Sequence, residues 1–183
     1  MNRQLKILNT ASAFSIFAAA LFAPFYAVFV DKIGGGAFIA GSSYSIYAIV
    51  AGILIFISSR LEDKVVDTRK LVVLGYFIST IGFFGYLLVD NAVQLFAVQA
   101  VVGIATAVRS PAFDEVYSRN LDEGRYAYEW GLWESMYWIV SGISAMAAGY
   151  IIQNHGFDPL FTIMGSLSLV GAVISTALIM KEE

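Results

Sequence analysis

Charged side chains inside apolar sequence are the first candidates for chemistry in this chain. The stretch RYAYEWGLWESMYW, residues 125–138, places Glu129 and Glu134 among six aromatic residues, and Arg109 ends another apolar run. A charge inside a membrane is costly, so it persists where it is paired or faces an aqueous cavity. In such a place a carboxylate can carry a coupling proton or contact a cation, and an arginine can contact an anion.

Glu134 lies on a helix face suited to a cavity wall. Residues three, four and seven positions apart share one face of a helix. We therefore predict that Glu134 is the protonatable residue of the site. Glu129 lies about 140° round the helix from it, which indicates a snorkelling or loop-contacting charge. The aromatic and hydroxyl neighbours of Glu134 at these spacings are Trp130, Tyr137, Trp138 and Ser141.

The composition indicates a membrane protein. Of 183 residues, 58% are hydrophobic and 14% are charged, whereas a soluble domain carries about 25% charged residues. Cysteine is absent, which excludes disulfides and cysteine metal sites, and the net charge of −3 is too small to indicate a nucleic-acid partner. We find no phosphate-binding glycine loop, metal-spaced cluster or nucleophile–base pair, so we expect neither an enzyme nor a cofactor.

Six apolar segments are long enough to cross a bilayer as helices, since about 20 residues span its hydrocarbon core. Pro24 and Pro111 are expected to kink the first and fourth helices. The first helix also offers uncharged cavity candidates, namely Asn9, Ser12, Ser15 and Tyr26. The six segments are residues 8–30, 37–59, 71–89, 92–108, 135–152 and 159–180.

The basic residues fall almost entirely on one side of this arrangement. With both termini and the two charged loops on the same side, ten of the eleven lysines and arginines gather there, and only Lys32 lies opposite. The positive-inside rule then places both termini in the cytoplasm, and we expect the chain in the inner membrane of the cell. The ten residues are Arg3, Lys6, Arg60, Lys64, Arg69, Lys70, Arg109, Arg119, Arg125 and Lys181.

An internal repeat supports a specific architecture. The segment RKLVVLGYFIS follows the second span and DPLFTIMGSLS follows the fifth, with Gly75 and Gly165 at the same offset. The two turns lie on opposite membrane faces, so three helices are followed by three inverted ones, a plan that recurs in secondary transporters. We therefore predict an all-α membrane protein with six transmembrane helices in a 3+3 inverted repeat.

The loop after the second span carries the most specific motif. SRLEDKVVDTRKL, residues 59–71, is similar to the major facilitator superfamily signature between helices 2 and 3, Gly-x-x-x-Asp-Arg-x-Gly-Arg-Arg. Ser59 and Val66 replace its two glycines, and one residue is inserted. The resemblance implies a gating loop, whose acidic residue accepts hydrogen bonds from the N-terminus of a neighbouring helix 5. The charged positions of the signature are matched by Asp63, Lys64, Arg69 and Lys70.

Two further motifs extend the resemblance over about residues 7–180. VQAVVGIATAVRSPAF is similar to the helix 4 signature, with Gly103 retained but Gln99 where the family usually has arginine. SGISAMAAGYI is similar to the glycine-rich helix 5 signature of exporters and keeps Gly142 and Gly149 without its proline. The chain thus resembles the N-terminal six-helix half of a transporter of this superfamily. The resemblance implies that helices 4 and 5 extend over 92–119 and 126–152.

On that resemblance, Arg109 and Glu134 lie at similar depths below the turn between helices 4 and 5. Arg109 precedes Asn120 by eleven residues and Glu134 follows Arg125 by nine, which is about 16 and 14 Å at 1.5 Å per residue. They could pair across two antiparallel helices. The alternative is that both mark interfacial helix ends, with the tryptophans in the aromatic belt. The expected site for substrate or proton coupling comprises Glu134, Arg109, Tyr137, Trp138, Ser141 and Gln99.

Members of the superfamily bind substrate between two six-helix halves, so six helices need a second wall. We expect a secondary-active transporter of a small solute that works by alternating access as a parallel homodimer. The alternatives are a non-transporting six-helix partner protein, or an isolated half of a twelve-helix carrier. Small residues on helices 2 and 5 allow close approach and mark the expected dimer seam, although they could pack within one subunit. They are Gly41, Ser45, Ala48, Gly52, Gly142, Ala145 and Gly149.

Overall fold

The computed structural model describes residues 2–62 and 67–180, and helices make up most of both segments. Six helical units are long and apolar enough to cross a membrane, so the prediction of six membrane-spanning helices is confirmed. Asp63 and Lys64 of the expected gating loop lie outside the described residues. In chain order the elements are α1 (Arg3–Phe22), η1 (Ala23–Phe25), α2 (Tyr26–Lys32), α3 (Gly36–Glu62), α4 (Arg69–Gly85), η2 (Tyr86–Leu88), α5 (Ala92–Arg119), α6 (Tyr126–His155), α7 (Phe157–Ser175) and η3 (Thr176–Leu178).

The two prolines inside helices have different effects. Pro24 lies in the 3₁₀ turn η1, which separates α1 from α2 within the first crossing. Proline lacks an N–H and clashes with the preceding turn, so the regular helix is interrupted there. Pro111 lies inside α5 without interrupting it. It leaves the carbonyl of Ala107 without its usual helical donor, and Ser58 Oγ of α3 approaches that carbonyl oxygen to 3.4 Å as a replacement.

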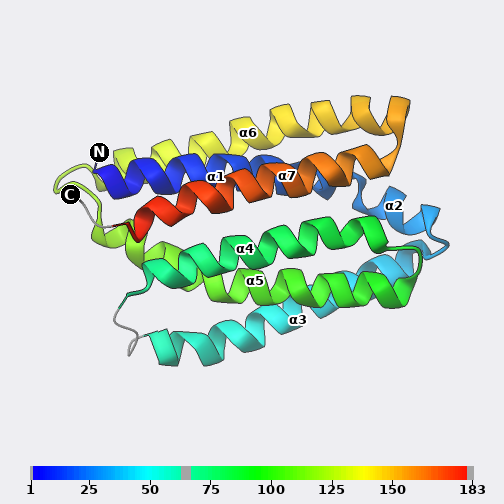
Figure 1. Cartoon of the computed structure of the whole chain (residues 1–183), viewed down its shortest axis with the longest axis horizontal. Helices are drawn as coiled ribbons and strands as arrows, with labels where there is room; N and C mark the ends of the chain where they lie inside the picture. Colours follow the sequence, from blue (N-terminus) through cyan, green and yellow to red (C-terminus); the bar gives the residue numbers. More distant parts are fainter. Residues whose placement is uncertain (1, 63–66, 181–183) are drawn as a thin grey trace.

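The crossings form a bundle with α3 and α6 at opposite edges (Figure 1). α1 packs against α6 and α7, α5 packs against α3 and α4, and α4 and α7 contact each other between these groups. The first helix of each repeat, α1 or α5, therefore packs against the second and third helices of the other repeat. The two repeats thus make equivalent contacts with each other, as a two-fold relation between them requires. This packing agrees with the predicted 3+3 architecture.

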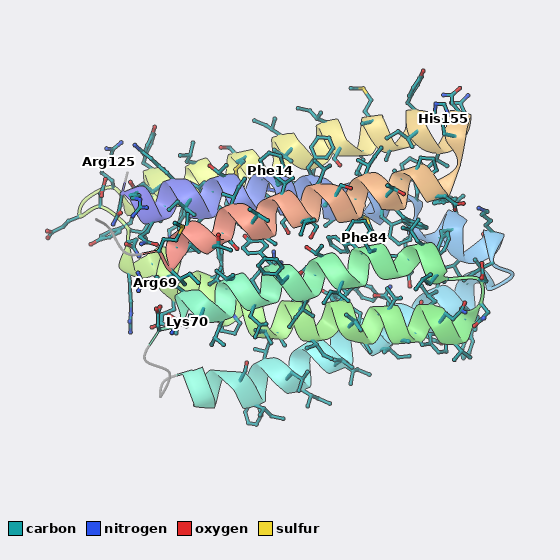
Figure 2. The ribbon with its side chains drawn as sticks, viewed as in Figure 1. Phe14, Arg69, Lys70, Phe84, Arg125 and His155 are labelled. Atoms are coloured by element: carbon teal, nitrogen blue, oxygen red, sulfur yellow. The ribbon has the colours of Figure 1, made fainter. Side chains whose placement is uncertain are left out.

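Glycines allow the closest contacts between neighbouring helices. A Cβ atom on Gly75 would lie 2.5 Å from Arg109 Cβ, and one on Gly171 would lie 2.8 Å from the Ala11 carbonyl oxygen. Both of these glycines are buried, so α4 lies directly against α5, and α7 against α1. Gly165, the repeat counterpart of Gly75, is also at a crossing, where a Cβ would lie 2.5 Å from the Phe84 ring of α4 (Figure 2).

Short connections fix the order of the helices at the bundle ends. Asn91 caps α5, since its side chain accepts hydrogen bonds from the backbone N–H groups of Val93 and Gln94, the usual role of asparagine before a first turn. Gly156 alone separates α6 from α7 with φ of +80°, a conformation that glycine adopts without steric cost. These two turns lie at the same end of the bundle, opposite the end where α1 begins (Figure 1).

Candidate functional site

A partly open cavity of about 610 Å³ lies among the helices of the bundle. Its lining comes from the first, second, fourth and fifth crossings, with contributions from α4 and α7. Binding sites for small molecules typically have volumes of about 300–1,000 Å³ and a mainly apolar lining with a few placed polar groups. The volume and the mainly apolar lining of this cavity therefore fall within the range of small-molecule binding sites.

Arg109 of α5 supplies a positive charge to this cavity. Its Cβ is held against α4 because Gly75 leaves room for it. Its Nη1 donates to Ser15 Oγ of α1 at 3.2 Å, and its guanidinium carbon lies 4.9 Å from the centre of the Tyr76 ring. Tyr76 is buried, and its hydroxyl is hydrogen-bonded to Ser12 of α1 at 2.9 Å. Three helices thus fix the position of one guanidinium group.

A second polar group at the cavity is a hydrogen-bond chain that joins α5, α2 and α3. Gln99 Nε2 of α5 donates to the Tyr26 hydroxyl at 2.6 Å, Tyr26 pairs with Ser43 of α3, and Ser43 Oγ donates to the Ile39 carbonyl at 2.7 Å. Because Ser43 donates to a carbonyl, its oxygen is the acceptor for Tyr26. Gln99 and Ser43 are buried. Gln99 therefore takes part in a neutral hydrogen-bond network.

Aromatic rings from the two edge helices form the sides of the cavity. Tyr44 and Tyr47 of α3 have ring centres 5.7 Å apart, and Tyr137 and Trp138 of α6 are 5.2 Å apart in an edge-to-face arrangement. All four residues line the cavity. They provide flat apolar surfaces with polar edges.

Five of the six expected site residues line this cavity, and Glu134 does not. The five come from α5 and α6 and converge although they are separated in sequence: Gln99, Arg109, Tyr137, Trp138 and Ser141. Glu134 is exposed one helical turn before Trp138. Ser15 and Tyr26, which were expected as candidates, also line the cavity, whereas Asn9 and Ser12 are not part of its lining.

A pairing of Arg109 with Glu134, one of the two arrangements that the sequence left open, is not present in the structure. α5 and α6 do run antiparallel from their shared turn, but they meet there through aromatic rings, Tyr117 against Trp130 at 4.6 Å and Phe113 against Trp133 at 5.9 Å. One helical turn further from the loop, the same alignment of α5 and α6 places Tyr137 level with Arg109. Glu134 follows Trp133 directly and therefore points about 100° away from that contact.

Glu129 contacts the loop, as expected, and it is also fully buried. Its Oε2 accepts a hydrogen bond from the Asp122 backbone N–H at 2.9 Å, and its backbone carbonyl accepts one from the Tyr117 hydroxyl at 2.8 Å. These bonds close the turn between α5 and α6. The burial was not foreseen, because it depends on how the turn folds back over the first turn of α6.

The described part of the expected gating loop lies at one end of the bundle. Arg69 and Lys70 begin α4, near the same end as Arg125, whereas His155 lies at the opposite end (Figure 2). Asp67 accepts hydrogen bonds from the Arg69 backbone N–H and from its Nε, the latter at 2.8 Å. The Arg69 guanidinium holds the pKa of the Asp67 carboxyl below its usual range, chiefly through this side-chain hydrogen bond.

The small residues of the expected seam lie mainly on open faces of the edge helices. Added Cβ atoms on Gly41, Gly52 and Gly142 would have no neighbour within 4 Å, whereas one on Gly149 would touch the Phe25 ring at 3.4 Å. Ser45 and Ala48 are exposed and Ala145 is half-buried. Most of these small residues therefore have an open face within the described subunit, whereas Gly149 lies against Phe25 of η1.

Some cavity residues were missed from the sequence. Tyr44 and Tyr47 belong to the lining, as does Thr106, whose hydroxyl lies 3.4 Å from that of Tyr47. The spacing of Tyr44 and Tyr47, three residues apart within an apolar helix, was an available signal. Among the described residues, no group of three histidine, aspartate or glutamate side chains is arranged to hold a metal ion.

Comparisons with known proteins identify the family. The family model described as Major Facilitator Superfamily matches residues 8–183. The in meso crystal structure of the POT family transporter PepTSo aligns with a TM-score of 0.76 at 13% identity, covering 97% of this chain and 37% of that one. The sequence matches none of the curated proteins with which it was compared. The structural likeness shows the fold, the family match covers nearly the whole sequence, and the chain belongs to the major facilitator superfamily.

Proposed function

We propose that this chain is the subunit of a secondary-active transporter that moves a small solute by alternating access as a parallel homodimer. The observation that carries the proposal is the partly open cavity, because its lining includes both edge helices, α3 and α6, as well as α1 and α5. In the most apolar stretch of α3 and of α6 only 11% of the residues are buried, against 28–50% in the other four crossings. A second six-helix unit placed on this face would complete the cavity wall.

The proposed orientation has both termini in the cytoplasm and the chain in the inner membrane. Arg69, Lys70 and Arg125 lie near the bundle end where α1 begins (Figure 2), and positive residues favour the cytoplasmic side. By sequence, Asp63 and Lys64, which lie outside the described residues, belong to the same proposed gating loop. Every subunit has its excess of basic residues at this end and therefore inserts in the same orientation. Two copies then associate in parallel, with their two-fold axis along the membrane normal.

The spacing of small residues supports contact between α3 of one copy and α6 of its partner. α3 begins at Gly36 and α6 ends at His155, and these two helix ends lie at the same end of the bundle (Figure 1). Counted from those ends, the small residues of the two helices fall at matching depths, about 8 and 9, 14 and 15, and 18 and 20 Å at 1.5 Å per residue. The matched pairs are Gly41 with Gly149, Ser45 with Ala145, and Ala48 with Gly142.

Alternating access can be tested before a substrate is known. The chain has no cysteine, so Thr106→Cys introduces one thiol into the cavity lining. We expect a membrane-impermeant thiol reagent to label it both in right-side-out and in inside-out vesicles, because the cavity opens to each face in turn. Ile81→Cys on α4, where Ile81 is exposed outside the lining, is the matched control and should be labelled from neither face. Labelling of Thr106→Cys from only one face would contradict the proposal.

Glu134 is proposed as the proton-coupling residue, because it is exposed on α6 one helical turn before Trp138 of the cavity lining. Glu134→Gln removes the titratable group while keeping its size. We expect proteoliposomes with this variant to lose uptake driven by a pH gradient and to keep solute exchange without a gradient. Glu123→Gln, in the exposed turn before α6, is the control. Gradient-driven uptake at the wild-type level in Glu134→Gln would remove Glu134 from the mechanism.

A different six-helix partner is the second candidate arrangement. The chain spans 37% of the PepTSo chain that it resembles, which leaves room for a non-identical second half. The same face of α3 and α6 would then contact that half, so assembly decides between the two arrangements.

A further inference from the structure

We infer that the cavity selects organic anions and that Arg109 contacts the anionic group. The inference names a substrate class for the site described above, so it rests on the proposed function. Among the described residues, Arg109 is the single charged side chain in the cavity lining. A cavity with one cation and no carboxylate in its wall favours negative charge.

The charge of Arg109 is not neutralised by a nearby ion pair within the subunit. Ion pairs such as those of Arg69 with Asp67 and of Arg119 with Glu115 occur elsewhere in the described part of the chain, and Arg109 takes part in neither of these two. Asp114 interacts with Arg109 electrostatically, but it is exposed and lies outside the lining. An arginine within a membrane-spanning helix persists where it is paired or faces an aqueous path, and an anionic solute would supply the missing partner.

The guanidinium group is held ready for such a partner. One nitrogen donates to Ser15, one face lies against Tyr76, and the side-chain stem is fixed against Gly75. Arginine has five N–H donors in a planar fork that matches a carboxylate or a phosphate. Among the described residues the guanidinium makes one hydrogen bond, to Ser15, and Arg109 lines the cavity, so its other N–H groups can serve an anion bound there with little further ordering of the side chain.

The remaining lining residues favour a solute whose uncharged part is aromatic or apolar. Tyr44, Tyr47, Tyr137 and Trp138 present rings to the cavity, and rings pack well against other rings and apolar groups. Phenylacetate, phenylacetamide and phenethylamine share this kind of body and differ in charge, being negative, neutral and positive. This series therefore separates the effect of charge from the effect of size and shape.

The test measures binding of these three compounds to the full chain in lipid nanodiscs. Quenching of tryptophan fluorescence reports binding because Trp138 lines the cavity, and calorimetry confirms the dissociation constants. We expect phenylacetate to bind most tightly. Arg109→Gln should weaken its binding by about ten- to a hundredfold, the range for loss of a hydrogen bond to a charged group, and should remove the preference for the anion. Arg109→Lys should keep the preference at reduced affinity.

Arg119→Gln is the matched control, because Arg119 is exposed and paired with Glu115 on the same helix; it should leave all three dissociation constants unchanged. The inference is overturned if phenylacetamide or phenethylamine binds the wild type as tightly as phenylacetate, if Arg109→Gln binds phenylacetate like the wild type, or if none of the three binds. The wild-type ranking decides the matter even where Arg109→Gln fails to fold. Anion binding together with labelling of Thr106→Cys from one face only would overturn transport and leave the anion site standing.

Discussion

Gly75→Ala should lower the stability of the folded chain by about 1–3 kcal/mol, the usual effect of overpacking a tight contact. The added methyl would lie 2.5 Å from Arg109 Cβ and 3.0 Å from both the Cα and the backbone nitrogen of the same residue. Two of these three atoms belong to the α5 backbone, so no side-chain rotation relieves the contact. α4 and α5 would have to move apart, and Arg109 would move with α5. We therefore expect the variant to bind phenylacetate more weakly as well.

The midpoint of thermal unfolding in mild detergent checks this prediction. Gly131→Ala is the control, because Gly131 is an exposed glycine of α6 and an added Cβ there would have no neighbour within 4 Å. It should be neutral or stabilise the helix by up to about 1 kcal/mol, the propensity difference between glycine and alanine. If the two variants unfold at the same temperature, α4 and α5 are not as close as Gly75 and Arg109 indicate.

The spans and the repeat could be predicted from the sequence because each rests on local information. Apolar length alone gives six crossings, since a helix is the only single segment that satisfies its own backbone in a bilayer. Gly75 and Gly165 indicated a repeated unit because both occupy close helix crossings, where a larger residue would not fit. Pro24 likewise indicated a kink in the first helix, and the structure has the 3₁₀ turn η1 at this position.

Contacts between helices could be predicted less well, because they depend on how each helix is rotated about its axis as well as on how deep each residue lies in the membrane. Arg109 and Glu134 were placed at similar depths, yet Tyr117 and Phe113 pack on Trp130 and Trp133 and turn Glu134 away. Neighbours in sequence also need not be the main neighbours in space, since α6 packs chiefly on α1. The Gln99–Tyr26–Ser43 chain joins three helices, and no spacing within a single helix could reveal it.

Gly142→Leu and Ala48→Leu should each separate the proposed dimer into monomers and stop transport. Both positions lie on open faces of the subunit, and a Cβ at Gly142 would meet nothing within 4 Å, so the subunit itself should fold. In a parallel two-fold dimer the α3–α6 contact occurs twice. Overpacking of about 1–3 kcal/mol at each contact therefore weakens association by about 2–6 kcal/mol. Native mass spectrometry in nanodiscs measures the result, and Ser166→Leu, at an exposed position of α7, should leave the dimer intact.

Cross-linking identifies the partner and the faces that meet. Within one subunit α3 and α6 lie at opposite edges of the bundle (Figure 1), so a bond between Ser45→Cys and Ala145→Cys must join two chains. Ser45→Cys protein mixed with Ala145→Cys protein should form covalent dimers of twice 19.9 kDa, and either protein alone should not, because the two-fold axis brings each residue near the other and not near itself. Ile81→Cys mixed with Ser45→Cys should remain monomeric. A strictly monomeric wild type in nanodiscs, or covalent capture by a chain of different mass, would exclude the homodimer and assign the open face of α3 and α6 to a non-identical half.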